Sequence, residues 1–595
     1  PDALRMVPGL NVARLESNKW AISSRGFNDR FSNKLLVLID GRNVYSPTFS
    51  GVYWEVQDTL LEDIERIEVI RGPGATLWGA NAVNGVINII TKHAADTQGR
   101  FVTVGGGTEE EVFGGARYGT SLGEGTYGRV YFKGFKRDSF VESSGNNAHD
   151  DWDSLRGGFR MDSQPSIEDS LTIQGDIYGG DINQKVDLPQ LDAPYLQTHQ
   201  GESNVSGGNI VSRWQHTLSP TSDYTLQLYY DRTDRKDIFI REVRNTLDLD
   251  FQLSYSAIQR HDVIWGLGYR YTHDRFSRLV SVITNPDSRN DQLFSGFLQD
   301  EITLMENKLW LTLGSKFEHN DYSGFEIQPN ARLLWTPDPH HKFWGAVSRA
   351  VRTPSRFEHD FQVRAQVTPP FSTSNATPFP IEVRLQGSSD YDSEKLISYD
   401  VGYRFIPSQS LSVDITGFFS NYHKLRNNKL TSPSFQGTHL LVEPRFTNQW
   451  KAKTYGIEVA SIWQPVEWNR LDLAYSYLSM KVDTGNEEGA QVPLSPKHQV
   501  SLRSAFDLSH DINLDFWFRY ISESSGLNSR GLTEFKIDSY FTLDMRVAWR
   551  PYDNFELSLV GQNLLDSQHK EFQQSLFTGS SEVERGIYGK LSWHF

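Results

Sequence analysis

The side chains that could do chemistry in this chain are aromatic and basic rather than nucleophilic or metal-binding. The chain has no Cys, which excludes disulfide bonds and thiolate metal sites. Its five Met form no thioether cluster that would suit copper. His340 and His341 lie together in TPDPHHKF, where a solvated pair is the simpler interpretation. The spacing of Ser, His and Asp residues singles out no catalytic triad. We therefore expect no catalytic centre, and we expect that the protein is not an enzyme.

Aromatic side chains are concentrated in the segment 45–54, YSPTFSGVYW, where a turn is expected. The rings are those of Tyr45, Phe49, Tyr53 and Trp54. One interpretation is that they pack against a neighbouring wall. The other is that they form a stacking platform for an aromatic or planar ligand.

Basic side chains gather in the segments 232–244 and 423–450, and acidic ones in 149–153 and 181–202. A basic surface attracts anionic ligands. The candidate contacts for such a ligand are Arg241, Lys424 and Arg426. The acidic segment 181–202 could bind a structural Ca²⁺ through carboxylate oxygens, although it lacks close D-x-D spacing. Solvated surface charge is the alternative for all four segments.

The elements that must position these residues are short strands. From about residue 97 to the C-terminus, apolar and polar residues alternate in segments about 20 residues apart, and a period of two is typical of a strand with one apolar face. The best example places Phe541, Leu543, Met545, Val547 and Trp549 on one face.

Connections between these segments alternate in length. Short ones include 305–307 and 508–511, and the longest are about 355–393 and 423–450. Counting strands in this way gives about 22, with both ends on the short-turn side. This pattern predicts an all-β transmembrane barrel of antiparallel strands, and a lumen of that size needs a plug. Aromatic residues beside the short turns predict an interfacial belt: Trp335, Phe343, Trp344, Trp463, Trp468 and Trp549.

The first 96 residues have a different pattern, with helix-like and strand-like periods mixed. The stretch 64–92 passes through a glycine-rich turn and ends in the β-branched run VINIITK. These residues predict a small mixed α/β domain at 1–96, in front of a barrel at 97–595.

Composition supports the barrel and excludes other classes. The net charge of −15 argues against a nucleic-acid partner, and no segment approaches the roughly 18 apolar residues of a membrane-spanning helix. The mean hydropathy of −0.50 is compatible with a barrel whose polar residues face the lumen. A soluble propeller or sandwich is the structural alternative.

Three motifs in the N-terminal domain, ISSRGF (22–27), LLVLIDGRNVY (35–45) and the stretch 64–92, resemble in this order the plug of TonB-dependent outer-membrane receptors. The resemblance implies a bacterial outer-membrane receptor that actively imports a scarce metal chelate with energy from TonB. A ferric siderophore is the commonest cargo of the family. Cobalamin, haem, another metal complex or an oligosaccharide are alternatives, and a porin-like passive channel is a distant one.

The resemblance also assigns residues to a latch between plug and barrel. In the family, arginines of the RG motifs are buried against barrel glutamates, which by motif match gives Arg25 and Arg71 on the plug. The barrel partners are Asp400 in SYDVGYRF and Glu458 in YGIEVASIW. Asp400 departs from the usual Glu, so its shorter side chain needs a closer strand or a water. Guanidinium groups suit bidentate pairing of this kind.

Ligand contacts in such a receptor come from the outward plug apices and the long loops. The resemblance places one apex at NDRFSN, with Asn28, Asp29, Arg30 and Phe31, and the other at the aromatic segment 45–54. The proline-containing connection 355–393 is expected to be an external, mobile lid. Further partners implied are outer-membrane lipid and lipopolysaccharide. The TonB-contacting segment is expected to precede residue 1, and the receptor to act as a monomer without a cofactor.

Overall fold

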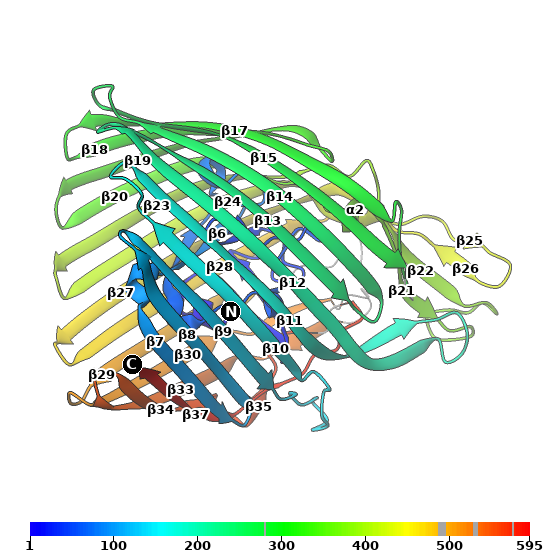
Figure 1. Ribbon diagram of the computed structural model, residues 1–595. Coiled ribbons are helices and arrows are strands. Elements are labelled where there is room, and N and C mark those ends of the chain that lie inside the picture. The colour runs from blue at the N-terminus through cyan, green and yellow to red at the C-terminus, as the bar shows by residue number, and fades with distance from the viewer. Residues whose placement is uncertain (279–280, 486–494, 528–533, 574–575) are drawn as a thin grey trace.

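The computed structural model describes residues 1–278, 281–485, 495–527, 534–573 and 576–595. Their strands form a closed barrel around an N-terminal plug (Figure 1). No helix in these ranges is both long and apolar enough to cross a membrane. The fold class expected from the sequence is confirmed.

Of the described strands, 22 pair antiparallel with their neighbours to form the barrel. They are β7 (Gly99–Gly107), β8 (Val112–Gly123), β9 (Thr126–Arg137), β10 (Trp152–Ser163), β11 (Asp169–Pro189), β12 (Leu196–Ser219), β13 (Ser222–Lys236), β14 (Ile240–Tyr255), β15 (His261–Arg278), β17 (Ser288–Met305), β18 (Leu309–Asn320), β19 (Gly324–Asp338), β20 (His341–Arg352), β23 (Glu394–Ser408), β24 (Leu411–Lys429), β27 (Arg445–Val466), β28 (Asn469–Asp483), β29 (His498–Asp507), β30 (Ile512–Ile521), β33 (Tyr540–Tyr552), β34 (Phe555–Gln562) and β37 (Gly586–His594). The last strand, β37, pairs with β7 and closes the barrel.

The alternation in the sequence becomes an outer and an inner face. On β33, Phe541 is 50% exposed on the outside, whereas Thr542 is 1% exposed on the inside. Beside the short turns, the rings of Trp335 and Phe343 stack at 5.3 Å. Trp344 follows Phe343 directly and therefore lies on the opposite face of β20, so it does not belong to the expected outer belt.

The connections have the expected asymmetry, with short turns at the left-hand end of Figure 1 and long connections at the right-hand end. Three segments that looked like loops are instead mostly strand. Residues 181–202 belong to β11 and β12, 232–244 to β13 and β14, and 423–450 to β24 and β27, with connections of only 190–195, 237–239 and 430–444. On β11 the outward positions of the first of these segments are polar, whereas Ile182, Val186 and Leu188 face inward and are buried. This is the reverse of the apolar-outward alternation that identified the other strands.

The long connections at the right-hand end carry short elements of their own. They are β16 (Val282–Thr284), α2 (Arg356–Asp360), β21 (Phe361–Thr368), β22 (Ile381–Gln386), β25 (Ser434–Phe435), β26 (Leu440–Val442), β31 (Ser524–Leu527), β32 (Glu534–Ile537), β35 (Gln568–His569) and β36 (Val583–Glu584).

The plug lies before β7, and its described elements form two small sheets. The elements are η1 (Asp2–Met6), β1 (Leu10–Glu16), β2 (Lys19–Ser24), β3 (Leu35–Ile39), β4 (Arg42–Asn43), η2 (Trp54–Val56), η3 (Leu61–Asp63), β5 (Ile64–Arg71), α1 (Ala75–Trp78), β6 (Gly85–Thr91) and η4 (Ala94–Thr97). The strands β1 and β2 form a hairpin, and the other sheet has the order β4-β3-β6-β5. The run VINIITK becomes β6, which lies between β3 and β5.

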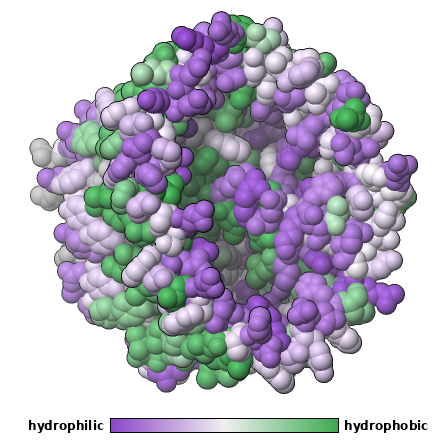
Figure 2. Space-filling model, turned by 90° about the vertical axis from the view of Figure 1, so that its left-hand side faces the viewer, coloured by the Kyte–Doolittle hydropathy of each residue, from purple (hydrophilic) through white to green (hydrophobic). Residues whose placement is uncertain are grey.

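The apolar core of the plug is continuous with the inner wall of the barrel. Trp20, Val37 and Ile87 of the plug belong to one buried cluster with Phe135 and Trp152 of the barrel. The plug is therefore seated by apolar burial as well as by polar contacts. Figure 2, which views the short-turn end, shows a hollow at the centre of this face.

Candidate functional site

The two plug arginines assigned to the latch lie where strands of the plug end: Arg25 directly after β2, and Arg71 as the last residue of β5, before the turn at Gly72. Arg25 follows the last residue of β2 and has a left-handed backbone (φ 53°), and its N–H donates to the Gly9 carbonyl at 3.3 Å. Gly9 and Gly72 border the pair with positive φ. A Cβ would lie 2.4 Å from Glu458 Oε1 at Gly9, and 2.7 Å from Arg25 Nη1 at Gly72. Glycine at both positions is therefore required by space as well as by conformation.

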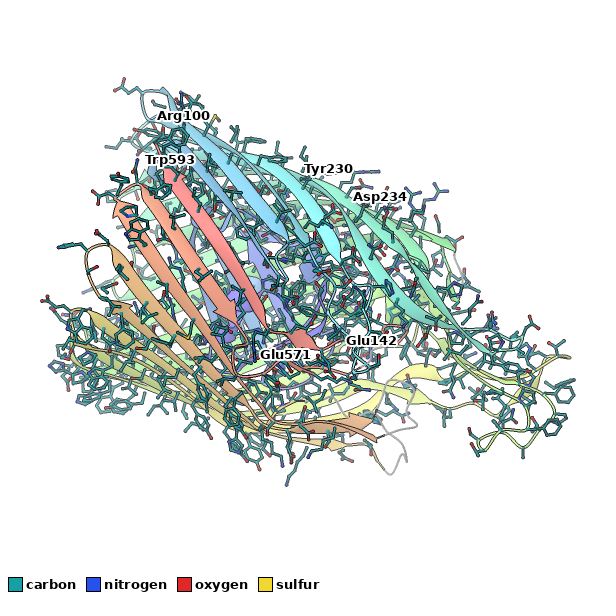
Figure 3. All side chains as sticks on the ribbon, turned by 90° about the horizontal axis from the view of Figure 1, so that it is seen from below. Arg100, Glu142, Tyr230, Asp234, Glu571 and Trp593 are labelled. Carbon is teal, nitrogen blue, oxygen red and sulfur yellow. The ribbon has the colours of Figure 1, made fainter. Side chains whose placement is uncertain are left out.

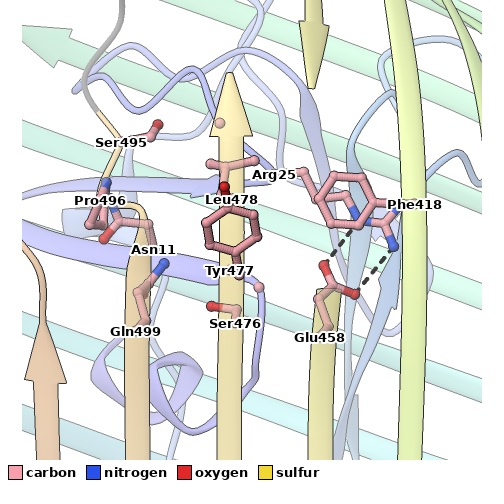
Figure 4. Close-up of a pocket in the computed structure, with 12 residues that line it drawn as sticks. Asn11, Arg25, Phe418, Glu458, Ser476, Tyr477, Leu478, Ser495, Pro496 and Gln499 are labelled. Carbon is pink, nitrogen blue, oxygen red and sulfur yellow. Dashed lines mark hydrogen bonds and ion pairs between the residues drawn. The ribbon is translucent and has the colours of Figure 1, made fainter. Parts of the chain in front are cut away.

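The Arg25 side chain is 2% exposed and contacts two barrel carboxylates, Asp400 and Glu458. Figure 4 shows the pairing with Glu458. Nη1 donates to Asp400 Oδ1 at 2.6 Å, while Nε and Nη2 donate to the two oxygens of Glu458 at 3.0 and 3.2 Å. The guanidinium also lies 4.1 Å from the ring centroid of Phe418. The shorter Asp400 side chain reaches Arg25 directly, without the water that its length suggested.

Arg71 meets the same carboxylate from a second turn of the plug. Its Nη1 lies 3.2 Å from Glu458 Oε2, and its Nη2 lies 3.8 Å from Asp414 Oδ1. The sequence interpretation missed Asp414. It lies on the inward face of β24, two residues from Thr416, which is the register partner of Glu458. Alternation on β24 shows that Asp414 faces inward, but only the register places it beside Glu458.

The four-stranded sheet of the plug has its own contacts with the barrel wall. Arg213 donates to the Asp40 carbonyl at 2.7 Å, and Arg42 pairs with Asp231 at 2.8 Å. On the other side, the N–H of Ala80 donates to Glu318 at 2.8 Å. These contacts hold the sheet against β12 and β13 at one place and against β18 at another.

A cavity of about 560 Å³ lies between these two attachments, bounded by the plug sheet and the wall from β12 to β18. Polar and apolar side chains both line it. Those from the plug include Leu38, Tyr45 and Asn88, and those from the barrel include Asp250, Arg270 and Asp291. The plug therefore leaves a polar space along one side of the lumen.

The two expected plug apices lie against each other. Phe31 contacts Phe49 edge-on at 5.1 Å, and Phe49 contacts Tyr53 in the same way at 4.9 Å. The guanidinium of Arg30 lies 5.0 Å from the ring of Phe31, and that of Arg235 lies 4.3 Å from the ring of Tyr53. The structure thus joins the two segments into one aromatic group.

The members of these apices differ in burial. Asn28, Phe49 and Trp54 are buried, and Trp54 belongs to the plug core. Asp29, Arg30, Phe31, Tyr45 and Tyr53 are half-buried. Burial raises the pKa of Tyr45 to about 12, so its hydroxyl remains protonated at neutral pH. Trp54 is buried because it packs in the plug core. Part of the Phe31 side chain remains exposed and could contact a ligand.

The connection between β20 and β23 is packed onto the plug at its base. The N–H groups of Arg356 and Phe357 donate to the carbonyls of Pro47 and Thr48 at 3.0 and 2.9 Å. Beneath α2, fully buried Arg352 pairs with Glu358 at 2.8 Å. Burial alone would raise the pKa of Glu358, but the charge of Arg352 holds it below its usual value. The expected lid is thus anchored at this base, and it is exposed farther along, at Phe371.

The three basic residues proposed for ligand contact all have carboxylate partners. Arg241 pairs with Asp234 at 2.9 Å, Lys424 with Asp392 at 2.5 Å and Arg426 with Glu358 at 3.4 Å. Lys424 and Arg426 lie together on β24, whereas Arg241 lies on β14. Their positive charge is largely neutralised. In the described part of the chain, no three His, Asp or Glu side chains are grouped so as to hold a metal ion.

One excess of positive charge was missed by the sequence interpretation. Arg364 on β21 and Arg384 on β22 are register partners in an antiparallel ladder. Like charges in this position destabilise a strand pair. The two guanidinium groups share one buried carboxylate, Glu382, at 3.1 and 2.8 Å, and His439 lies 3.1 Å from its other oxygen. Arg364, Arg384 and Glu382 together therefore keep a net positive charge. Only the strand register shows that the two arginines lie opposite each other.

Comparison with known proteins agrees with this architecture. A family model described as "TonB dependent receptor-like, beta-barrel" matches residues 105–564, and one described as "TonB-dependent Receptor Plug Domain" matches residues 1–86. The chain is 24% identical to the iron-regulated outer membrane virulence protein of Vibrio cholerae serotype O1, over 95% of this chain and 86% of that protein.

Two solved structures share the fold over the whole chain. The siderophore receptor PirA from Acinetobacter baumannii has a TM-score of 0.81 and 17% identity, covering 100% of this chain and 95% of that one. A variant of the ferric enterobactin receptor PfeA from Pseudomonas aeruginosa, in complex with enterobactin, has a TM-score of 0.79 and 17% identity, covering 100% and 96%.

Replacing the arginine shared by the two latch carboxylates should unseat the plug. Arg25→Ala leaves Asp400 without its guanidinium partner, and uncompensated buried charge costs about 3–5 kcal/mol. We expect higher conductance in planar bilayers and greater sensitivity of cells to bulky antibiotics. Arg71→Ala should have a smaller effect because Glu458 keeps Arg25 as a partner.

The control is Arg66→Ala, which removes an exposed plug arginine paired only with Glu65 and Glu68. Wild-type conductance from a normally inserted Arg25→Ala barrel would contradict the latch.

Proposed function

The chain belongs to the TonB-dependent receptor family, and from this premise we propose that it imports a ferric siderophore across the bacterial outer membrane. The ligand binds at the long-loop end of the barrel. Energy transduced through TonB then rearranges the plug and admits the ligand to the periplasm. Membership in a receptor family agrees with the expectation that the chain is not an enzyme.

The names of the relatives support an iron-containing cargo. The Vibrio cholerae protein is described as iron-regulated, PirA as a siderophore receptor, and the PfeA structure holds enterobactin. Within this chain, the observation that supports an anionic chelate as the ligand is the excess positive charge of the pair Arg364 and Arg384. Guanidinium groups are the usual partners of carboxylate-like oxygens.

The seating of the plug supports active transport over passive diffusion. Arg25 and Arg71 join two plug turns to buried carboxylates, and the four-stranded sheet is bonded to the wall at two further places. Opening such a plug requires work. A porin-like channel would need no such domain and would conduct in the resting state.

Titration with a panel of chelates tests the cargo and the charged pair together. We would follow tryptophan fluorescence while adding ferric catecholate, ferric hydroxamate, ferric citrate, haem and cobalamin to the purified receptor. One ferric chelate should quench saturably, and its iron-free form should not. If it is anionic, Arg384→Gln should weaken binding about 10- to 100-fold, since a hydrogen bond to a charged group contributes about 1.5–3 kcal/mol.

The matched control for this pair is Arg241→Gln, which removes an exposed loop-end arginine that already has its own carboxylate. Equal losses in the two variants would show only a general charge effect. Saturation by cobalamin alone, or by none of the panel, would reject the siderophore proposal and leave the plugged transporter intact.

A second prediction separates ligand stacking from packing at the aromatic apex. We expect Phe31→Ala to weaken binding of the quenching chelate about two- to tenfold, since aromatic contacts contribute about 0.5–1.5 kcal/mol beyond the area they bury. The thermal stability of the plug should be unchanged. Trp54→Ala should instead destabilise the plug by about 3–5 kcal/mol, as loss of a core aromatic does. Wild-type affinity in a folded Phe31→Ala protein would leave packing as the role of the rings.

A further inference from the structure

The last connection of the barrel, between β34 and β37, turns inward and lies on the plug. We call its residues 568–573 and 576–582 the strap. The strap residue Glu571, labelled in Figure 3, accepts two hydrogen bonds from the guanidinium of Arg5, at 2.8 and 2.7 Å. The same carboxylate accepts from the N–H of Arg14 at 2.9 Å. The side chains of Arg5 and Glu571 are only 7% and 1% exposed, so this is a buried bidentate pair.

Apolar contacts join the strap to the same part of the plug. Phe572 is buried in a cluster with Ala13, Leu15 and Ala21, which belong to the hairpin β1–β2. The small side chains of Ala13 and Ala21 leave space for the ring of Phe572. We call residues 2–24, which comprise η1, β1 and β2, the hairpin unit.

A second group of polar contacts lies farther along the strap. Ser581 donates its N–H to the Leu15 carbonyl at 2.8 Å, and its hydroxyl donates to Asp150 at 2.9 Å. Asp150 also accepts from the N–H of Ser17 at the tip of the hairpin unit, at 2.8 Å. The strap therefore contacts the hairpin unit at η1, through Arg5, and at the C-terminal end of β1, through Arg14 and Leu15.

Between these contacts, the strap enters the apolar group that closes the long-loop end. We call this group the mouth cluster. Its buried members are Val186, Leu188, Phe276, Val282, Phe361, Val363 and Phe577. Phe577 is the member contributed by the strap, and its carbonyl accepts from the N–H of Asp187 at 2.9 Å. The other members come from β11, β15, β16 and β21, so the strap is packed among three other loop regions.

The rest of the plug is attached differently. The four-stranded sheet is bonded to barrel strands, through Arg42 to Asp231 and through Ala80 to Glu318. Those partners belong to the rigid wall. The hairpin unit also contacts the wall, through Trp20 against Trp152 and a hydrogen bond from Asn18 to the Asn183 carbonyl at 3.0 Å. It differs from the sheet because it is bonded in addition to a loop whose own position depends on the packing of the mouth cluster.

We propose that the strap couples the packing of the extracellular mouth to the restraint of the hairpin unit. With the mouth cluster packed, Phe577 fixes the strap, and Glu571 and Phe572 hold the hairpin unit in place. When the mouth loops separate, the strap loses its fixed end and the hairpin unit is released, while the four-stranded sheet stays bonded to the wall. The coupling is a property of the fold and holds for any cargo.

Hydrogen exchange measured by mass spectrometry on the detergent-purified protein tests this coupling. Phe577→Ala removes the mouth end of the strap and leaves Arg5 and Glu571 unchanged. We expect amides of 10–24 to exchange roughly tenfold faster, as in local opening of one cooperative unit. Amides of 85–91, in β6 of the four-stranded sheet, should keep wild-type rates. Glu571→Gln, which weakens the plug end directly, should give the same selective increase.

The matched control is Phe446→Ala, which removes another buried phenylalanine at the long-loop end that lies outside the mouth cluster. It should leave 10–24 at the wild-type rate. Wild-type exchange of 10–24 in Phe577→Ala, with an increase in Glu571→Gln, would make the strap a static anchor and overturn the coupling. Equal acceleration of 10–24 and 85–91 would also overturn it. Heat-modifiable migration in gels would verify that each barrel is folded.

Discussion

The ion pairs of the buried Glu458 carboxylate with Arg25 and Arg71 are the interactions around which the plug is seated. Two turns of the plug, far apart in sequence, bring Arg25 and Arg71 to this one barrel residue. A buried charge is tolerated only while its partners are present, so the plug must keep both turns in place to stay seated. The same requirement extends to the backbone. Gly9 and Gly72 lie where any larger side chain would collide with the ion pairs.

Around this centre the plug is held as two units by different parts of the barrel. Wall strands hold the four-stranded sheet, through Asp231 and Glu318, whereas the hairpin unit is held by the inward-turned strap in addition to wall contacts such as Trp20 with Trp152. The cavity of about 560 Å³ lies beside the sheet, between its two wall contacts. A rearrangement of the plug therefore need not break all of its contacts at once. The hairpin unit has a restraint from the strap that the sheet lacks, while the hydrogen bond from Asn84 to the Ser24 carbonyl joins the two units.

The long-loop end is closed by packing rather than by charge. Phe577 and Phe361 contribute to a buried apolar group, and the base of the connection after β20 rests on the plug at Pro47 and Thr48. Several basic side chains at this end have carboxylate partners, among them Arg241 and Lys424, so part of the basic surface suggested by composition is cancelled. The cross-strand pair Arg364 and Arg384 keeps an excess of positive charge because both share Glu382. Retaining two like charges opposite each other breaks a local rule of strand pairing, which is typical of a functional position.

The sequence by itself determined the class of the molecule. The period of two along segments such as 541–549, the alternation of short and long connections, and the three plug motifs were enough for a plugged barrel of about 22 strands, and motif matching identified Arg25, Arg71, Asp400 and Glu458. Each of these signals is local or depends on a short pattern. Strand ends such as that of β11 in 181–202 were missed because their outward face is polar and their apolar residues, Val186 and Leu188, face inward. Only the tertiary structure decided that Asp414 joins the latch, that Arg364 faces Arg384, and that the strap reaches Arg5. These contacts depend on strand register and on loops that cross the lumen, and residues brought together in this way leave no pattern along the chain.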